Sequence, residues 1–289
     1  MSTQKTLPNL DFAMQRSPTA TPSASSQIAG TAAFSKFVHL LQLISDTAEP
    51  LTIAELSKLS GYPRPTVHRT VAALVAERLL EESPRTGRLV LGPRLIQLAS
   101  RSWERSELRL AAIEDIKKLR DITGETIHLA VLNGQHMVYI EKLESPSAVR
   151  MTSRIGTNVS LHSTAVGKAY LAALEESACE KLLKAQPDPL PCYTPRTIAT
   201  LPDLRHQLAD IRSRGWSIDD EEQEPGICCF GAAIIGHQGH PLAAISVSTL
   251  RFRQKEEPLQ SYVQPLLEAC KAISRRISET PAFSDADAF

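Results

Sequence analysis

The sequence has few cysteines and no long apolar run, and both shortages limit where the protein works. Five cysteines in 289 residues are an odd number spread through a medium-sized chain, which argues for reduced thiols rather than a disulfide framework. The chain shows no charged-then-apolar leader, and no apolar run approaches the roughly 20 residues that cross a bilayer. We therefore expect a cytoplasmic protein with no membrane partner.

The chain also lacks net charge, because 32 lysines and arginines balance 32 aspartates and glutamates. A global basic field that would attract polyanions is thus absent. Basic charge is instead local: residues 60–94 contain six arginines against three glutamates. The length exceeds the usual size of one domain, so two folded domains plus tails are expected.

Residues 51–80 contain two short segments with helical apolar spacing, joined by a tight turn. The apolar positions are Ile53, Leu56 and Leu59 before Gly61, and Val67, Val71 and Leu74 after it. This layout is typical of a helix-turn-helix, although an amphipathic helix pair alone also fits ordinary bundle packing. A stripe that includes Phe34, Phe37, Val38, Leu41 and Ile44 predicts a preceding helix over residues 33–45.

The second helix of this pair carries the residues expected to contact DNA. With Val67, Val71 and Leu74 facing the core, a helical wheel turns a polar set outward or to the flank, namely Arg64, Pro65, Thr66, His68 and Arg69. Prolines suit the first helical turn, where a missing N–H costs nothing, and the positive end of the helix dipole favours phosphate.

A basic hairpin follows the helix pair. Residues 80–83 and 88–91 flank the turn-rich tetrapeptide PRTG, which places Arg85 and Arg88 at or beside the tip. Helix, tight turn, helix and basic hairpin in one run of 60 residues predict a winged helix-turn-helix that reads double-stranded DNA. The protein would then be associated with the nucleoid.

The rest of the chain predicts a linker helix and an α+β domain with an antiparallel sheet and flanking helices. The expected domains are a tail at 1–32, the winged helix-turn-helix at 33–92, the linker helix at 93–105, the α+β domain at 106–278 and a tail at 279–289. Within the α+β domain, runs rich in β-forming residues predict strands at 126–132, 137–143, 149–153, 216–219, 227–235 and 242–249. Helical spacing predicts helices at 164–174, 177–184, 203–214 and 259–277.

Three ordered motifs resemble the IclR family of bacterial transcriptional regulators. They are GYPRPTVHR at 61–69, SRIGTNVSLHSTAVGKA at 153–169 and DDEEQEPGICC at 219–229. The resemblance implies a winged helix-turn-helix, a linker helix and a GAF-like effector domain, assembled as a homodimer or a dimer of dimers. ETIHL at 125–129 and TLRF at 249–252 are most similar to repressors of the subgroup that senses 2-keto-3-deoxygluconate.

The resemblance also implies an effector site for a small organic acid in the second domain. Its positions here are Met151, Ser163, Thr164, Ala165, Val166, Asp219, Ile227, Cys229, Ser246 and Ser248. If Ser163 or Thr164 caps the following helix, the backbone N–H groups of Ala165 and Val166 would hold a carboxylate, with Gly167 leaving room for close approach. Ser246 and Ser248 would share one strand face.

Other chemistries fit the residues less well. The pair His237 and His240 lacks a third converging ligand, and the adjacent Cys228 and Cys229 cannot form a metal clamp, so no metal or other cofactor is expected. A nucleophilic enzyme could be imagined with Cys229 or Ser163 beside His162 or His128, but no spacing favours it. Lys168 is expected on a helix surface, and the acidic run at 219–222 is expected to be solvated.

The sequence thus predicts a ligand-responsive DNA-binding regulator rather than an enzyme. We expect a repressor of a catabolic operon that senses a sugar acid or a 2-keto acid. An activator of aromatic-acid catabolism in the same family is the alternative, and an enzyme that uses Cys229 is a more distant one.

Overall fold

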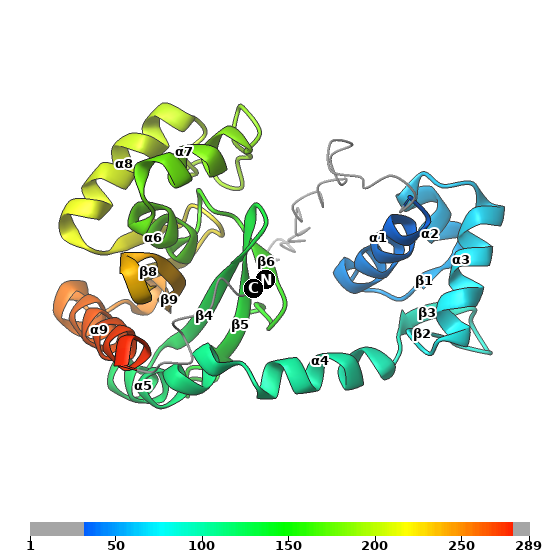
Figure 1. The fold of residues 1–289 in the computed structure, drawn as a ribbon, viewed down its shortest axis with the longest axis horizontal. Coiled ribbons are helices and arrows are strands. Elements are labelled where there is room, and N and C mark those ends of the chain that lie inside the picture. The colour runs from blue at the N-terminus through cyan, green and yellow to red at the C-terminus, as the bar shows by residue number, and fades with distance from the viewer. Residues whose placement is uncertain (1–31, 280–289) are drawn as a thin grey trace, which may run out of the picture. The chain divides into compact units, whose positions relative to one another are not determined.

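The computed structural model describes residues 32–279, which form two compact units that divide between Arg105 and Ser106 (Figure 1). The expected tails, at 1–32 and 279–289, lie outside the described residues apart from one position each. Ala32 begins the first helix and Glu279 ends the last one, so helix replaces tail at these two positions. Among the described residues, no helix is long and apolar enough to cross a membrane.

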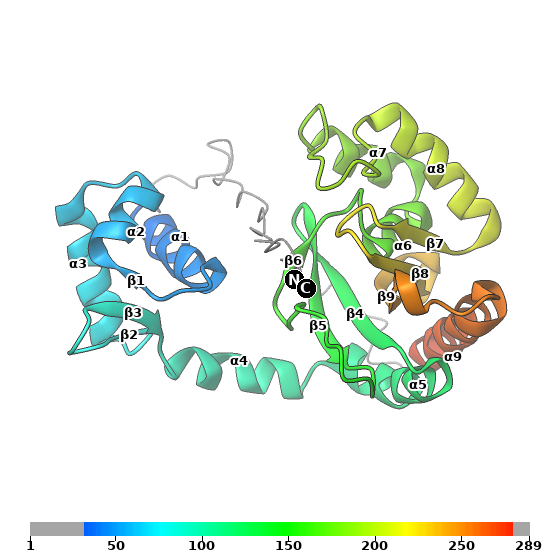
Figure 2. The ribbon, with the colours of Figure 1, turned by 180° about the vertical axis from the view of Figure 1, so that it is seen from behind.

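The first unit packs three helices and a small sheet around one apolar core. Its elements are α1 (Ala32–Asp46), β1 (Leu51–Thr52), α2 (Ile53–Ser60), α3 (Arg64–Ala76), β2 (Leu80–Glu82), β3 (Arg88–Leu91) and α4 (Arg94–Glu104). The strands pair antiparallel in the order β1-β3-β2, and Figure 2 shows α3 beside the β2–β3 hairpin. The helix-turn-helix and its hairpin are therefore where the sequence predicted them.

Local chemistry fixes both ends of α2. The Thr52 hydroxyl accepts the N–H of Glu55, and the Glu55 carboxylate accepts the N–H of Thr52 at 2.8 Å, which is a capping box. Gly61, at φ 70°, ends the helix in the left-handed region, where a side chain would be strained. Together these ends set the tight turn before α3.

The apolar stripe of α1 differs from the prediction. Leu40 and Ile44 are buried and Phe37 and Leu41 are partly buried, whereas Phe34 is 70% exposed. Phe37, Leu40, Leu41 and Ile44 follow the i, i+3, i+4, i+7 spacing of a single helix face. Phe34 lies one turn before Phe37 in the first turn of the helix, and Val38, at 46% exposed, lies beside the buried face, so the inclusion of both in the core was wrong.

The second unit is an α+β domain built on one antiparallel sheet, which confirms the predicted fold class. Its strands are β4 (Thr126–Asn133), β5 (His136–Leu143), β6 (Asn158–Val159), β7 (Ser217–Asp220), β8 (Ile227–Ile235) and β9 (Pro241–Leu250), in the order β6-β5-β4-β9-β8-β7. Its helices are α5 (Glu107–Thr123), α6 (Ala165–Ala173), α7 (Glu176–Lys184), α8 (Leu201–Arg214) and α9 (Gln264–Glu279). One π-helical turn, Leu259–Val263, precedes α9.

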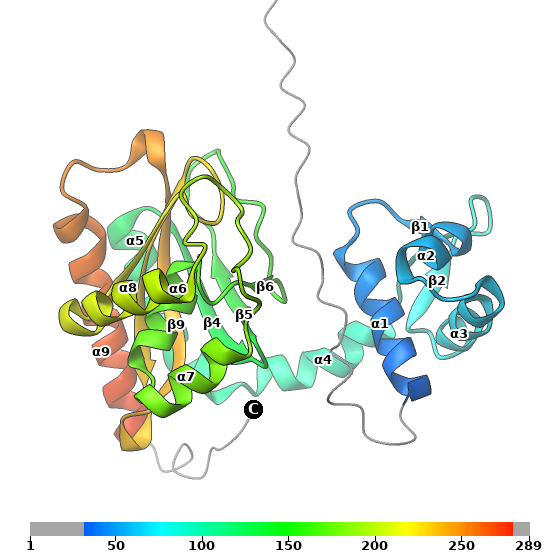
Figure 3. The ribbon, with the colours of Figure 1, turned by 90° about the horizontal axis from the view of Figure 1, so that it is seen from above.

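The two faces of this sheet carry different layers (Figures 1 and 3). Successive strand residues point to opposite faces, so Leu129, Phe230 and Val247 pack with α5 and α9 in one core. Ala130, Tyr139 and Ala244 pack with α6, α7 and α8 in a second core on the other face. The second face also carries a group of polar residues that includes His128, Asp219 and Ser246.

The expected strand at 149–153 is not formed. The Lys142 ammonium donates to the carbonyl oxygens of Met151 at 2.9 Å and Ser153 at 2.7 Å, so a side chain rather than a neighbouring strand engages this backbone. The sheet edge is completed by β6, whose Val159 pairs with Met137. Residues 151–153 instead cross the polar face as an irregular segment, which we call the strap.

Candidate functional site

The first candidate surface is the exposed side of α3. Val67, Val71 and Leu74 are at most 2% exposed, so the helix buries the face that the sequence predicted. Arg64, Pro65, His68 and Arg69 are exposed, and Thr66 is half-buried at the edge. The five positions expected to contact DNA thus lie together at the start of one helix.

The two arginines of the hairpin differ in their surroundings. Arg85 is exposed in the turn between β2 and β3, where Gly87 takes the left-handed conformation at φ 63°. The Arg88 guanidinium instead hydrogen-bonds the carbonyl of Pro50 and lies 3.8 Å from the Glu55 carboxylate. Arg88 therefore braces the start of α2, and Arg85 is the more available cation of the pair.

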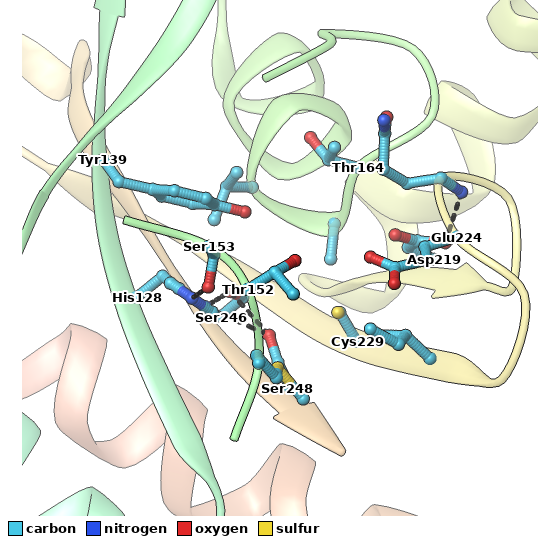
Figure 4. A pocket seen from close by; sticks show the side chains of 15 residues that line it. His128, Tyr139, Thr152, Ser153, Thr164, Asp219, Glu224, Cys229, Ser246 and Ser248 are labelled. Carbon is cyan, nitrogen blue, oxygen red and sulfur yellow. Dashed lines mark hydrogen bonds between the residues drawn. The ribbon is translucent and has the colours of Figure 1, made fainter. Parts of the chain in front are cut away.

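The second candidate site is a cavity of about 70 Å³ on the polar face of the large sheet (Figure 4). Strand register explains its floor: Asp219 pairs with Cys229, Cys229 with Ser248, and Ser246 with His128. Because paired residues point to the same face, four neighbouring strands present these side chains side by side.

The N-terminus of α6 forms another wall of the cavity. The Thr164 hydroxyl accepts the N–H of Gly167 at 3.1 Å and donates to the carbonyl of Ser160 at 2.6 Å, so Thr164 is the cap. Ala165 and Val166 line the cavity in the first turn, where helix N–H groups have no partner within the helix. The expected alternative cap, Ser163, does not line the cavity and instead donates to the Gln223 amide oxygen at 2.7 Å.

Two glycines set how close α6 lies to its neighbours. A Cβ at Gly231 would come within 2.5 Å of the Ala165 carbonyl oxygen, and one at Gly167 within 2.5 Å of the Ser160 carbonyl oxygen. The Ser217 hydroxyl also donates to the Ala165 carbonyl at 2.6 Å. Gly167 therefore permits backbone packing behind the cavity, which corrects the expectation that it leaves space for a ligand.

A histidine with three serine hydroxyls forms one end of the cavity. His128 is 2% exposed, and its ring stacks on Tyr139 with centroids 4.4 Å apart. Its Nδ1 lies 3.2 Å from the Ser248 hydroxyl and its Nε2 lies 2.8 Å from the Ser153 hydroxyl. Burial, with a smaller effect from the Lys142 charge, lowers the pKa of His128 to about 3, so the imidazole is neutral at physiological pH.

Asp219 forms the acidic side of the cavity. Its Oδ1 accepts the backbone N–H groups of Glu222 at 2.8 Å and Gln223 at 3.2 Å. Burial raises the pKa of Asp219 to about 7, although Lys168 and these hydrogen bonds act in the opposite direction. Burial also raises the pKa of the neighbouring Cys229 well above its usual value, which keeps this sulfur a thiol and argues against a nucleophilic role.

Lys168 was expected on the surface and is instead fully buried in an ion pair with Glu222. Burial lowers the pKa of Lys168 and raises that of Glu222, while the pairing opposes both shifts. The expectation of a solvated acidic run was also wrong for Asp219 and Glu222, which are 3% and 5% exposed. The reason is that α6 is covered on all sides, so its single charged residue needs a buried partner.

Nine of the ten expected effector positions line this one cavity, and Ser163 is the exception. Sequence reasoning missed six further lining residues: His128, Tyr139, Thr152, Ser153, Gln223 and Glu224. His128 and Tyr139 depend on strand register, which no local pattern reveals. Within residues 32–279, no group of three His, Cys, Asp or Glu side chains is placed to hold a metal ion.

Comparisons with known proteins match both units. The family model of the IclR helix-turn-helix domain matches residues 34–84, and that of the bacterial transcriptional regulator IclR C-terminal domain matches residues 101–275. The HTH-type transcriptional regulators XynR and KdgR of Escherichia coli are 32% and 31% identical to the chain. These matches cover 83% and 84% of this chain, and 94% and 91% of XynR and KdgR.

A solved structure supports the same relationship. The crystal structure of the Thermotoga maritima IclR is 31% identical, with a TM-score of 0.66. The match covers 84% of this chain and 98% of that one. Both units therefore have counterparts along nearly the full length of these proteins.

Proposed function

Because the chain belongs to the IclR family of bacterial transcriptional regulators, we propose that it is a repressor whose operator affinity is set by a small organic acid. Its family places it among DNA-binding regulators and not among enzymes. In the proposal, the exposed side of α3 and Arg85 contact operator DNA in the cytoplasm. The acid binds in the cavity of the second unit and weakens that contact.

The observation that carries the effector site is the chemistry of the cavity walls. Thr164 caps only the N–H of Gly167, so the first-turn N–H groups of Ala165 and Val166, at the positive end of the helix dipole, face the cavity and favour a carboxylate. Among the described residues, no lysine or arginine lines the cavity, whereas Asp219 and Glu224 do. The helix terminus therefore provides the anion-binding group, and the Glu224 carboxylate, together with Asp219 when it is ionised, would repel a second negative charge.

The DNA interface requires two copies of the chain. One winged unit contacts too little DNA for tight selective binding, whereas a symmetric dimer reads two half-sites. An apolar face also lies on α4, where Ile96, Ala99 and Trp103 follow helical spacing and Ile96 is 73% exposed, and no α4 residue is buried within the described chain. We assign this apolar face to contact with a second copy.

Ile96→Glu is expected to weaken the dimer about tenfold or more, since the substitution buries a carboxylate in an apolar interface. Sedimentation equilibrium measures the dissociation constant directly. Gln97→Glu is the matched control, because it adds the same charge one residue away on the polar side of α4. Equal dissociation constants for the two variants would exclude this face as the interface.

Ser246→Ala together with Ser248→Ala is expected to abolish the response to the acid while operator binding stays intact. Both hydroxyls are 2% exposed and line the cavity, and losing buried hydrogen bonds to a ligand costs about 1–3 kcal/mol each. A thermal-shift screen of sugar acids, keto acids and aromatic acids, starting with 2-keto-3-deoxygluconate, identifies the acid. Calorimetry then compares the double variant with Ser278→Ala, whose hydroxyl bonds the carbonyl of Ser274 within α9.

An unchanged calorimetric affinity in the double variant would reject the cavity as the effector site. An operator-binding assay with and without the same acid distinguishes a repressor from an activator. A repressor of this kind releases DNA when the acid binds, whereas an activator retains it or binds it more tightly.

A further inference from the structure

His128 and the hydroxyls around it form a hydrogen-bonding cluster at one end of the cavity (Figure 4). Besides its contacts at 3.2 Å to Ser248 and 2.8 Å to Ser153, Nδ1 lies 3.5 Å from the Ser246 hydroxyl. The hydroxyls of Ser246 and Ser248 are 3.4 Å apart. The cluster thus contains one imidazole and three hydroxyls connected by four contacts.

The cluster has more acceptors than donors. A neutral imidazole supplies one N–H and one acceptor nitrogen, and each hydroxyl supplies one hydrogen and two acceptor positions. The group therefore has four polar hydrogens and seven acceptor positions. A ring nitrogen forms only one full hydrogen bond, so Nδ1 cannot bond both Ser246 and Ser248 at once, and three bonds form in either tautomer. One hydroxyl hydrogen and four acceptor positions then stay open to a ligand. This end of the cavity therefore offers more acceptors than hydrogens, which suits a ligand hydroxyl better than a group that cannot donate.

The strap keeps this arrangement in place. The Lys142 ammonium holds the strap through the carbonyls of Met151 and Ser153, and the Ser153 side chain meets His128. Tyr139 stacks on the imidazole from the side of β5, and Ser248 and Ser246 contact it from β9. The ring is consequently fixed in orientation by three separate parts of the chain.

The two ends of the cavity are complementary in hydrogen bonding. The α6 terminus is rich in donors and suits a carboxylate, while the His128 cluster is rich in acceptors and suits hydroxyl groups. On the basis of the proposed effector site, we infer that His128 is a specificity-determining residue that selects a hydroxylated monocarboxylate. Such a ligand places its carboxylate at Ala165 and Val166 and donates a hydroxyl hydrogen to the cluster.

The cavity volume limits the size of that ligand. One water needs about 10–15 Å³ of volume measured in this way, so about 70 Å³ holds roughly five to seven waters, which is room for a small organic acid. A hydroxy acid of two or three carbons, such as glycerate, fits this limit. Six-carbon sugar acids exceed it, and propionate fits the volume but leaves the cluster without a donor. Tartronate carries a second carboxylate, which Glu224 and the ionised form of Asp219 oppose.

Calorimetry of the full chain with a matched ligand series tests the inference. The probes are both enantiomers of glycerate, lactate, 3-hydroxypropionate, propionate, tartronate and 2-keto-3-deoxygluconate. Wild-type protein is expected to bind its preferred hydroxy acid about tenfold or more tightly than propionate, because unmet buried hydrogen bonds weaken binding on this scale. Tartronate and 2-keto-3-deoxygluconate are expected to bind more weakly than that hydroxy acid.

Two substitutions of His128 assign the preference to this residue. His128→Phe is expected to bring the affinities for the hydroxy acid and propionate to within about twofold of each other, since it retains the ring and removes both nitrogens. His128→Asn keeps a donor and an acceptor and is expected to recover part of the preference. His206→Phe, at an exposed position on α8, is the matched control and is expected to leave every affinity unchanged.

Each outcome is decisive. A wild-type protein that binds these acids without preferring hydroxylated ones overturns the inference but leaves the effector site standing. A preference that persists in His128→Phe also overturns the role of His128. If wild-type protein binds none of the acids, the proposed effector site fails as well. The wild-type ligand series needs no variant, so the inference remains testable even if His128→Phe fails to fold.

Discussion

Replacing Arg69 with alanine is expected to lower operator affinity by about 10- to 100-fold per protomer. Arg69 is exposed on α3, opposite the buried Val67 and Val71, where a recognition helix presents its side chains to base edges. A good arginine contact to a base contributes about 1–3 kcal/mol, and a tenfold change corresponds to about 1.4 kcal/mol. Loss of this contact is therefore among the largest single effects available to the DNA-binding unit.

Fluorescence anisotropy at several salt concentrations measures this change in operator affinity. The operator fragments are first selected from genomic DNA with the wild-type protein. A base contact predicts weaker discrimination between operator variants, whereas a phosphate contact predicts uniform weakening and a smaller salt slope. Arg275→Ala removes an exposed arginine from α9 and serves as the control. An Arg69→Ala protein with wild-type affinity would show that this side of α3 does not bind DNA.

Replacing Lys168 with methionine is expected to destabilise the second unit by about 3–5 kcal/mol, because it leaves the buried Glu222 without its partner. Glu222 Oε2 already has no hydrogen-bond partner in the described structure, so losing Lys168 leaves the charge poorly compensated. In calorimetry, each kcal/mol lowers the midpoint of thermal unfolding by about 2–4 °C in a domain of this size. Lys168→Met with Glu222→Leu is the control, and it is expected to recover most of the loss because no unpaired charge remains.

The pH dependence of Lys168→Met follows from the same residue. Burial already raises the pKa of Glu222 in the folded protein, and removing Lys168 removes the main opposing influence. The folded state of the variant then binds a proton more tightly than the unfolded state does, so its stability rises as the pH falls. The rise is expected between neutral pH and the ordinary glutamate pKa of about 4.3. A variant as stable as wild type throughout that interval would contradict a structural role for the ion pair.

The sequence predicted the first unit well because its determinants are local. Helical spacing, Gly61 and the PRTG turn each act within a few residues, and α2, α3 and the β2–β3 hairpin all lie at the predicted positions. Arg88 is the exception, since its contact with the Pro50 carbonyl crosses between elements. The pairing of β1 with β3 brings Arg88 to Pro50, and the spacing of apolar residues in the sequence does not predict that pairing.

The sequence predicted those lining residues of the cavity that belong to a local motif. Thr164, Ala165 and Val166 belong to a recognisable helix start, and Ser246 and Ser248 alternate on one strand. His128 and Lys168 were missed because their partners lie 120 and 54 residues away. In the sequence such a pair is visible only as a polar residue within an apolar run, and this pattern does not indicate which distant residue is its partner.

The most direct test of the whole account is operator affinity measured by anisotropy during a titration with the acid that stabilises the protein most. We expect the wild-type dissociation constant for DNA to rise about tenfold or more at saturating acid, which requires only about 1.4 kcal/mol of coupling. The Ser246→Ala, Ser248→Ala protein is expected to show no such rise. An acid that binds in the cavity yet leaves wild-type operator affinity unchanged would contradict the account.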